Sequence, residues 1–167
     1  YDGTGPTVVI TSSTVSSGDT SNDTSIALTF TSSEATTNFA VGDITVTGGT
    51  LSNFAPSSST VYTATFTANS NGATSIDVAA GTYTDATGNS NTAATQFTWT
   101  MDATPPTMVV TSSTVSSGAT SNDSTIALTF TSSEATSNFA EADLTVSGGS
   151  LSDFSATSTT VYTATFT

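Results

Sequence analysis

Carboxylates are the only charged side chains in this sequence. The 167 residues include 13 Asp and Glu but no Lys, Arg, His or Cys. The absence of His removes the commonest general base and the commonest ligand of transition metals. The absence of Cys removes thiol chemistry, thiolate zinc sites and disulfides. The remaining set of hard oxygen ligands suits Ca²⁺, which takes six to eight oxygens from carboxylates, amides and carbonyls.

The charge pattern also limits the possible partners. The formal net charge is −13, whereas phosphate backbones and anionic membrane surfaces are bound by Lys and Arg. We therefore expect no binding to nucleic acid and no attachment to anionic lipid. No apolar run is long enough to cross a bilayer, so we expect no membrane insertion in this segment.

The segments that must position the carboxylates belong to a sequence repeat, whose second copy is incomplete. Residues 1–67 align without a gap with residues 101–167 and are identical at 48 of 67 positions, including the octapeptide TVYTATFT that ends the aligned part of each copy. A period of 100 residues is too long for a solenoid unit and fits whole domains in tandem. We expect one domain over 1–100 and a second over 101–167 that lacks the counterpart of 68–100.

Apolar residues alternate with Thr, Ser and other small or polar residues in several short runs. The runs are SIALTFTS, DITVTG, TVYTATFT, TSIDVAA and TQFTWTM, and PTVVITSS is read as a further strand that follows a proline, as an edge strand can. This period of two predicts strands with one apolar face, and Gly48-Gly49, Asn71-Gly72 and Thr87-Gly88-Asn89 mark turns between them. Seven or so short strands per 100 residues, without a helical stripe, predict an all-β fold of tandem immunoglobulin-like β-sandwich domains, the second one truncated in this chain.

Several motifs occur in an order that resembles a known family. The order is LTFTSSEAT, then VYTATFT, then IDVAAGTYTDATGN, then a D.TPPT junction. It resembles the bacterial Ig-like repeats of very large surface adhesins and extracellular stalk proteins, over the whole first copy and all of the second. The resemblance implies a secreted or surface-anchored array that is often rigidified by Ca²⁺ at the domain ends.

The sandwich fold predicts which oxygen ligands meet. In an Ig-type domain, the start of the first strand, the loop after the second strand and the last hairpin lie at one end. The ligands expected there are Asp2, Glu34, Asp85 and Asn89, and at the junction Asp102 and Glu134. Alternatively, Asp85 and Asn89 form only an Asx-stabilised turn and Glu34 is a solvated loop residue.

Other features could be functional or merely structural. Asn22 and Asn122 head N-x-[ST] triplets and are candidate glycosylation sites, although such triplets arise by chance in a Ser/Thr-rich chain. Pro105 and Pro106 predict a stiff junction, or simply begin an edge strand. Outward Thr faces could bind a crystalline lattice, but Thr also serves as a soluble strand former.

These observations predict a non-enzymatic extracellular spacer in a stalk, fibre or adhesin shaft, whose partners are neighbouring repeats of the same chain and other copies in a fibre. The acids are scattered over loops, so we expect no glycoside hydrolysis. The alternatives are a glycan- or partner-binding adhesin module that uses loops such as Gly48-Gly49, and a filament subunit completed by strand exchange. We interpret the sequence as part of a longer array.

Overall fold

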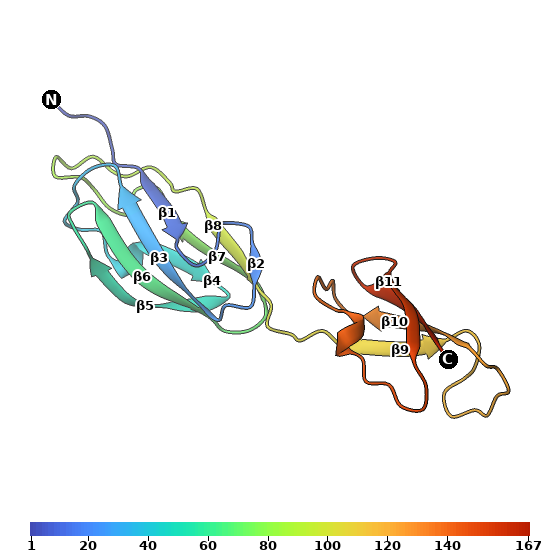
Figure 1. Ribbon diagram of the computed structural model, residues 1–167. Helices are drawn as coiled ribbons and strands as arrows, with labels where there is room; N and C mark the ends of the chain where they lie inside the picture. Colours follow the sequence, from blue (N-terminus) through green and yellow to red (C-terminus); the bar gives the residue numbers. More distant parts are fainter. The chain divides into compact units, whose positions relative to one another are not determined.

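Twelve β-strands and two single-turn 3₁₀ helices form the regular structure of the computed structural model, which covers residues 1–167 (Figure 1). The chain divides into two compact units, Tyr1–Thr104 and Pro105–Thr167. No helix is long and apolar enough to cross a membrane. The strands account for nearly all of the regular structure, as the alternating runs predict.

The first unit contains two four-stranded sheets. Its elements are β1 (Val8–Ser12), β2 (Thr20–Ser21), β3 (Ser25–Ser32), η1 (Val41–Asp43), β4 (Ile44–Thr47), β5 (Gly49–Pro56), β6 (Val61–Ala68), β7 (Gly72–Val78) and β8 (Phe97–Met101). One sheet has the order β1-β3-β6-β5 and the other the order β2-β8-β7-β4. The two sheets face each other as a sandwich, which confirms the predicted fold class (Figure 1).

The core of this unit is the set of apolar residues on the inner faces of both sheets. In β3, the inward residues Ile26, Leu28 and Phe30 are buried, and the Ala and Thr residues between them face outward or lie at the edge of the core. In the second sheet, β7 and β8 contribute Ile76 and Trp99 to the same core. Alternation with a period of two thus specifies which face of each strand is buried.

The two outer strands of the second sheet depend on its two inner strands. β4 pairs only with β7, in antiparallel register from Ile44↔Val78 to Thr47↔Ser75. β2 pairs only with β8, in a short parallel ladder of Thr20↔Thr100 and Ser21↔Met101. Without β7 and β8, neither outer strand would have a hydrogen-bonding partner in the sheet.

The second unit contains one sheet. Its elements are β9 (Met108–Ser112), β10 (Ile126–Ser132), η2 (Glu141–Asp143), β11 (Leu151–Ala156) and β12 (Val161–Phe166), and the sheet order is β11-β12-β10-β9. These strands correspond to β5, β6, β3 and β1 of the first unit. Residues 120–121 and 144–147, the counterparts of β2 and β4, are not strands.

Two details differ from the sequence-based expectation. Strand β5 is missing from the alternating runs because its register shifts between Ser52 and Ala55, and Asn53 there has φ of 54°. The strand-exchange alternative implies that a second unit without its last strands exposes Ile126, Leu128, Phe130, Tyr162 and Phe166, but Phe130 is only 3% and Tyr162 only 5% exposed. Phe139 and Phe154 cover them from within the same unit.

Candidate metal site at one end of the first unit

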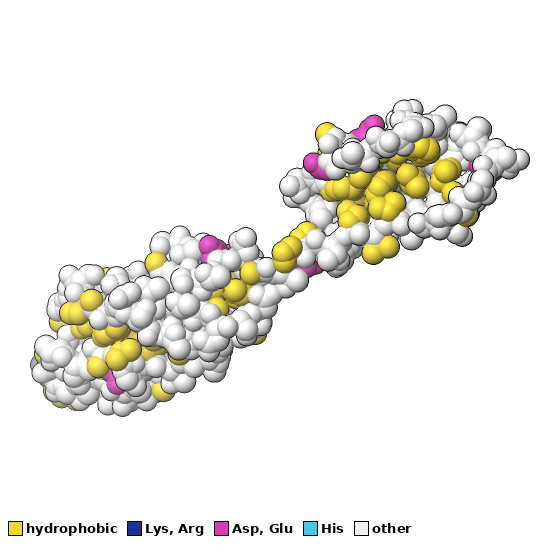
Figure 2. Space-filling model, turned by 90° about the horizontal axis from the view of Figure 1, so that it is seen from below, with side chains coloured by type: hydrophobic (Ala, Val, Ile, Leu, Met, Phe, Trp, Pro, Cys, Tyr) yellow, Lys and Arg dark blue, Asp and Glu magenta, His cyan; other side chains and the backbone are white.

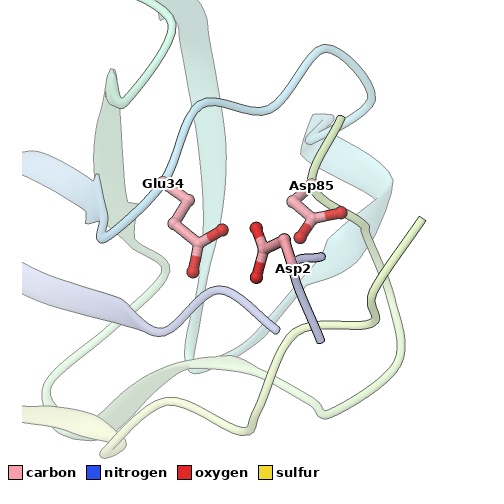
Figure 3. A group of neighbouring side chains, drawn as sticks. All are labelled: Asp2, Glu34 and Asp85. Carbon is pink, nitrogen blue, oxygen red and sulfur yellow. The ribbon is translucent and has the colours of Figure 1, made fainter. Parts of the chain in front are cut away.

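Three carboxylates from distant parts of the first unit face one another (Figure 3). Asp2 precedes β1, Glu34 follows β3, and Asp85 lies in the connection between β7 and β8. One carboxylate oxygen from each lies within 4.8 Å of the other two. The structure therefore brings together three of the six predicted metal ligands.

Pairing of the first two long strands places Asp2 near Glu34. β1 and β3 are antiparallel, with Val8 opposite Ser32, so the start of one strand lies beside the end of the other. The pairing continues past the strands, because the Ser33 amide donates to the Thr7 carbonyl at 2.9 Å and the Thr7 amide donates to Ser33 Oγ at 2.9 Å. The loop with Glu34 therefore begins beside the entry segment.

A close backbone approach holds the entry segment against the β7–β8 connection. The Thr92 amide donates to the Pro6 carbonyl at 2.9 Å. At Gly5, a Cβ atom would lie 1.9 Å from the Ser90 carbonyl oxygen, a distance that no side chain tolerates. Glycine is thus required at position 5 for this path, and the path places Asp2 beside Asp85.

Asp85 opens a tight turn that its own carboxylate stabilises. Its amide donates to the Asn89 carbonyl at 3.1 Å, and Gly88 adopts φ of +92°, which glycine tolerates without strain. The carboxylate accepts hydrogen bonds from the amides of Thr87 and Asn89, both at 2.8 Å, and from both side chains. This is the Asx-type turn that the sequence offered as the alternative to a metal site.

The buried side chain of Asn91 anchors the same connection to the sandwich. Asn91 is 3% exposed, and its Oδ1 accepts from the Thr82 amide at 2.8 Å and from the Tyr83 amide at 3.0 Å. Its Nδ2 donates to the carbonyls of Ala79 and Thr92. All polar atoms of this side chain are therefore paired, which fixes the loop that carries Asp85. The sequence contains no regular pattern that would have identified Asn91.

The electrostatics of the three carboxylates differ. Burial would raise the pKa of Asp85, which is 8% exposed, but the hydrogen bonds from Asn89 and Thr87 outweigh it and lower the pKa to about 2. Partial desolvation raises the pKa of Glu34, and the negative charges of Asp2 and Asp85 raise it further. Asp85 thus remains ionised, and the ionisation of Glu34 is opposed by its neighbours.

The donor set fits a hard divalent cation such as Ca²⁺. Asp2, Glu34 and Asp85 each offer one carboxylate oxygen to the cluster, and no cationic side chain in the sequence balances their charge. The turn at Asp85 does not exclude a metal, because it orients the carboxylate that a cation would contact. These residues would hold the ion, whose chemistry here would be charge neutralisation and crosslinking of three chain segments.

The other predicted ligands have different surroundings. Asn89 directs its amide nitrogen toward the cluster, where it donates to Asp85 Oδ2 at 2.8 Å and to the Asp2 carbonyl at 3.4 Å. Asp102 Oδ1 accepts from Asn71 Nδ2 at 3.0 Å and from the Thr104 amide at 3.1 Å, all within the first unit. Glu134 belongs to the second unit.

The two candidate glycosylation residues are exposed. Asn22 follows β2, and Asn122 occupies the equivalent position in the second unit. Both side chains are thus accessible for modification, and neither contributes to a core.

Comparison with known families gives one result for both copies. The family model described as "Bacterial Ig-like domain" matches residues 2–101 and again residues 102–167. No curated protein matches the chain at a significant level. The first match begins at Asp2 and includes Glu34 and Asp85.

Proposed function

Because this chain belongs to the family of bacterial Ig-like domains, we propose that its repeats are spacer units of a stalk, fibre or adhesin shaft outside the cell. Domains of this family indicate a structural repeat module, commonly occur in surface proteins and are typically non-enzymatic. The proposal adds the role of these particular repeats, which is to hold another part of the protein at a distance.

The distribution of core and charge supports a spacer role. The first unit buries its own aromatic and aliphatic core, including Phe66 and Trp99, so its stability does not depend on a neighbour. The outward positions of the first sheet are mostly Thr, which keeps the surface soluble without positive charge. A charge of −13 makes repeats repel one another and opposes collapse of an array.

We further infer that Ca²⁺ binds at Asp2, Glu34 and Asp85. The observation that carries this inference is the origin of the three carboxylates: Asp2 lies on the segment that enters the repeat, and Glu34 and Asp85 lie on loops of its body. A cation between them would fix the direction in which the chain enters the sandwich. A spacer gains stiffness from such a crosslink at each repeat end.

Thermal unfolding of the full chain tests the calcium site. Ca²⁺ at about 100 times its Kd should raise the Tm of the first unit by roughly 10 °C relative to chelator. Glu34→Gln should remove most of this increase, whereas Glu134→Gln, the same substitution at the equivalent position of the second unit, should leave it unchanged. An equal increase in both variants would contradict the assignment.

Small-angle X-ray scattering of tandem proteins with one to four complete repeats tests the spacer role. The maximum dimension should grow by a constant increment with each added repeat, and chelator should broaden the distribution of dimensions. Retention of a single repeat on a glycan array would contradict a pure spacer and support the binding-module alternative.

A further inference from the structure

The segment that leads from the first unit to the second is held in place by contacts of its own. Residues 102–107 lie between β8 and β9 and contain no strand. Figure 2 shows the connection as a single thin stretch of chain with hydrophobic side chains on its surface. By sequence, residues 101–104 open the second copy of the repeat, yet their contacts place them in the first unit. These contacts therefore decide how far the first unit extends into the next repeat.

Main-chain pairing with the first unit ends at Asp102. The Asp102 amide donates to the Ser21 carbonyl at 2.9 Å, one residue past the end of β8. No hydrogen bond between main-chain groups involves Ala103 or Thr104. A segment held only by main-chain pairing would therefore become mobile after Asp102.

The side chain of Asn71 supplies the missing partners. Asn71 lies in the turn between β6 and β7, beside the end of β8. Its Oδ1 accepts from the Ala103 amide at 3.1 Å, and its Nδ2 donates to Asp102 Oδ1 at 3.0 Å and to Thr104 Oγ1. The Asp102 carboxylate also accepts from the Thr104 amide at 3.1 Å. One side-chain amide thus binds three consecutive residues with both its carbonyl and its NH₂ group, and we call these four residues the exit clasp.

The chain has little freedom between the exit clasp and the second unit. Only Pro105 and Pro106 separate Thr104 from Thr107. Thr107 is fixed in the second unit, because its amide donates to Ser133 Oγ at 2.9 Å and its carbonyl accepts from the Ser133 amide at 2.9 Å. Each proline ring fixes φ at about −65° and restricts the residue before it to extended conformations. A closed clasp therefore leaves few rotations through which the chain can bend.

We propose that Asn71 sets the stiffness of the junction between repeats, because it holds the first residues of the next repeat against the β6–β7 turn. With the exit clasp closed, the chain bends only at residues 105–106; without it, the flexible stretch extends over residues 103–106. The proposal rests on the spacer role, in which stiff junctions keep an array extended. It does not depend on the calcium site, since no residue of the exit clasp belongs to the cluster of three carboxylates.

Backbone amide NMR relaxation of the full 167-residue chain tests the exit clasp. The order parameter S² of the Ala103 amide should be about 0.85 in the parent chain and should fall below about 0.6 in Asn71→Ala. The matched control is Asn69→Ala in the same turn, because only the backbone amide of Asn69 forms a hydrogen bond, to the Gly48 carbonyl. Both asparagines are exposed, so both variants should fold.

A reciprocal exchange of two polar side chains separates the exit clasp from a general loosening of the turn. Asn71→Asp places a second carboxylate beside Asp102 and should also lower S² of the Ala103 amide. Adding Asp102→Asn restores a donor and an acceptor across this contact, so the double variant should recover an S² above about 0.8. Failure of the second change to restore order would contradict a direct contact between the two side chains.

Distances between two spin labels, one in each unit, measure the bending. The sequence contains no Cys, so Ser57→Cys and Thr157→Cys at exposed positions give one label in each unit. The distance distribution should become at least about twofold broader in Asn71→Ala and stay unchanged in Asn69→Ala. The proposal is overturned if the Ala103 amide keeps its order in Asn71→Ala, if the distribution does not broaden, or if Asn69→Ala broadens it equally. Failure of the spacer role itself would instead appear in scattering, as a maximum dimension that does not grow with repeat number while the Ala103 amide stays ordered.

Discussion

The two units share 48 of 67 aligned residues, yet one forms two sheets and the other forms one. Residues 44–47 and 144–147 read ITVT and LTVS, and only the first of these segments is a strand. The difference between them is the presence of β7, with which β4 pairs. Local sequence therefore permits a strand here, but a hydrogen-bonding partner is needed to form it.

One part of the core, the aromatic cluster formed within the first two thirds of the repeat, is the same in both units. The ring centroids of Phe39 and Tyr62 lie 5.0 Å apart, and those of Phe139 and Tyr162 lie 4.9 Å apart. The stacked pairs with Phe54 and Phe154 also agree, at 5.8 and 5.9 Å. The first two thirds of the repeat thus contain a self-sufficient aromatic cluster, and the last third completes the sandwich over it.

The largest expected effect comes from completing the second unit. A chain extended after Thr167 by a copy of residues 68–101 should form the second sheet and convert 144–147 into a strand. Protection of these amides against hydrogen exchange should rise by roughly 10³-fold, or about 4 kcal/mol of local opening free energy. If hydrogen exchange in 144–147 stays fast in the extended chain, the absence of a pairing strand does not explain the difference between the units.

A matched pair of core truncations compares the two units directly. Leu28 is buried in the complete sandwich, and Leu128 is only half-buried. Leu28→Ala should cost about 3 kcal/mol of unfolding free energy in the first unit because it leaves a cavity. Leu128→Ala should cost less than about 1.5 kcal/mol because one side of that leucine already faces solvent.

Denaturant unfolding, monitored by an NMR resonance from each unit, measures both values. The core alanines Ala64 and Ala164, whose methyl groups lie in equivalent places, give one resonance per unit. Equal costs at both leucines would mean that the face of the second unit on which Leu128 lies is covered in solution.

The entry segment differs between the units at one residue that contacts backbone. Gly5 passes so close to Ser90 that a Cβ atom would lie 1.9 Å from its carbonyl oxygen, whereas the second copy has Pro105 at this position. Gly5→Pro should displace the entry segment, cost about 2 kcal/mol and abolish the calcium-dependent rise in Tm. The reverse substitution, Pro105→Gly, should leave both quantities of the first unit unchanged.

Calorimetry with and without Ca²⁺ checks this prediction, and Gly5→Ala isolates the effect of the Cβ atom from that of the proline ring. If Gly5→Ala keeps full calcium dependence, the close approach at Ser90 does not position Asp2.

The sequence predicted the features that depend on side-chain period. The alternating runs located β3, β4, β6, β7 and β8, and the run after Pro6 located β1. The arrangement of loops at one end of an Ig-type domain predicted that Asp2, Glu34 and Asp85 meet. It could not locate β5, because the bulge after Ser52 breaks the alternation. It also could not show that Asn91 anchors the loop, since the hydrogen bonds of a single polar residue leave no period in a sequence.

The smallest expected effect concerns pH and separates Glu34 from Glu134. The pKa of Glu34 is raised above 4.5 in the folded state, so its contribution to stability is fully present below pH 4.5 and is lost as pH rises through the raised pKa. The pKa of Asp85 is lowered from 3.8 to about 2, so its contribution is present above pH 3.8 and is lost as pH falls toward 2. Raising the pH above about 4.5 therefore lowers stability through Glu34, and lowering the pH below about 3.8 lowers stability through Asp85.

Glu34→Gln removes only the first of these contributions. In chelator at pH 7 the variant should be more stable than the parent chain, by roughly a few degrees in Tm, because it relieves repulsion from Asp2 and Asp85 at a partly exposed site. The advantage should vanish at pH 3.5, where Glu34 is protonated. In excess Ca²⁺ at pH 7 the order should reverse, because the parent chain then gains a ligand that the variant lacks. Glu134→Gln should show neither the advantage nor the reversal. If Glu34→Gln is less stable than the parent chain under all three conditions, the Glu34 carboxylate makes a favourable contact that outweighs repulsion from Asp2 and Asp85.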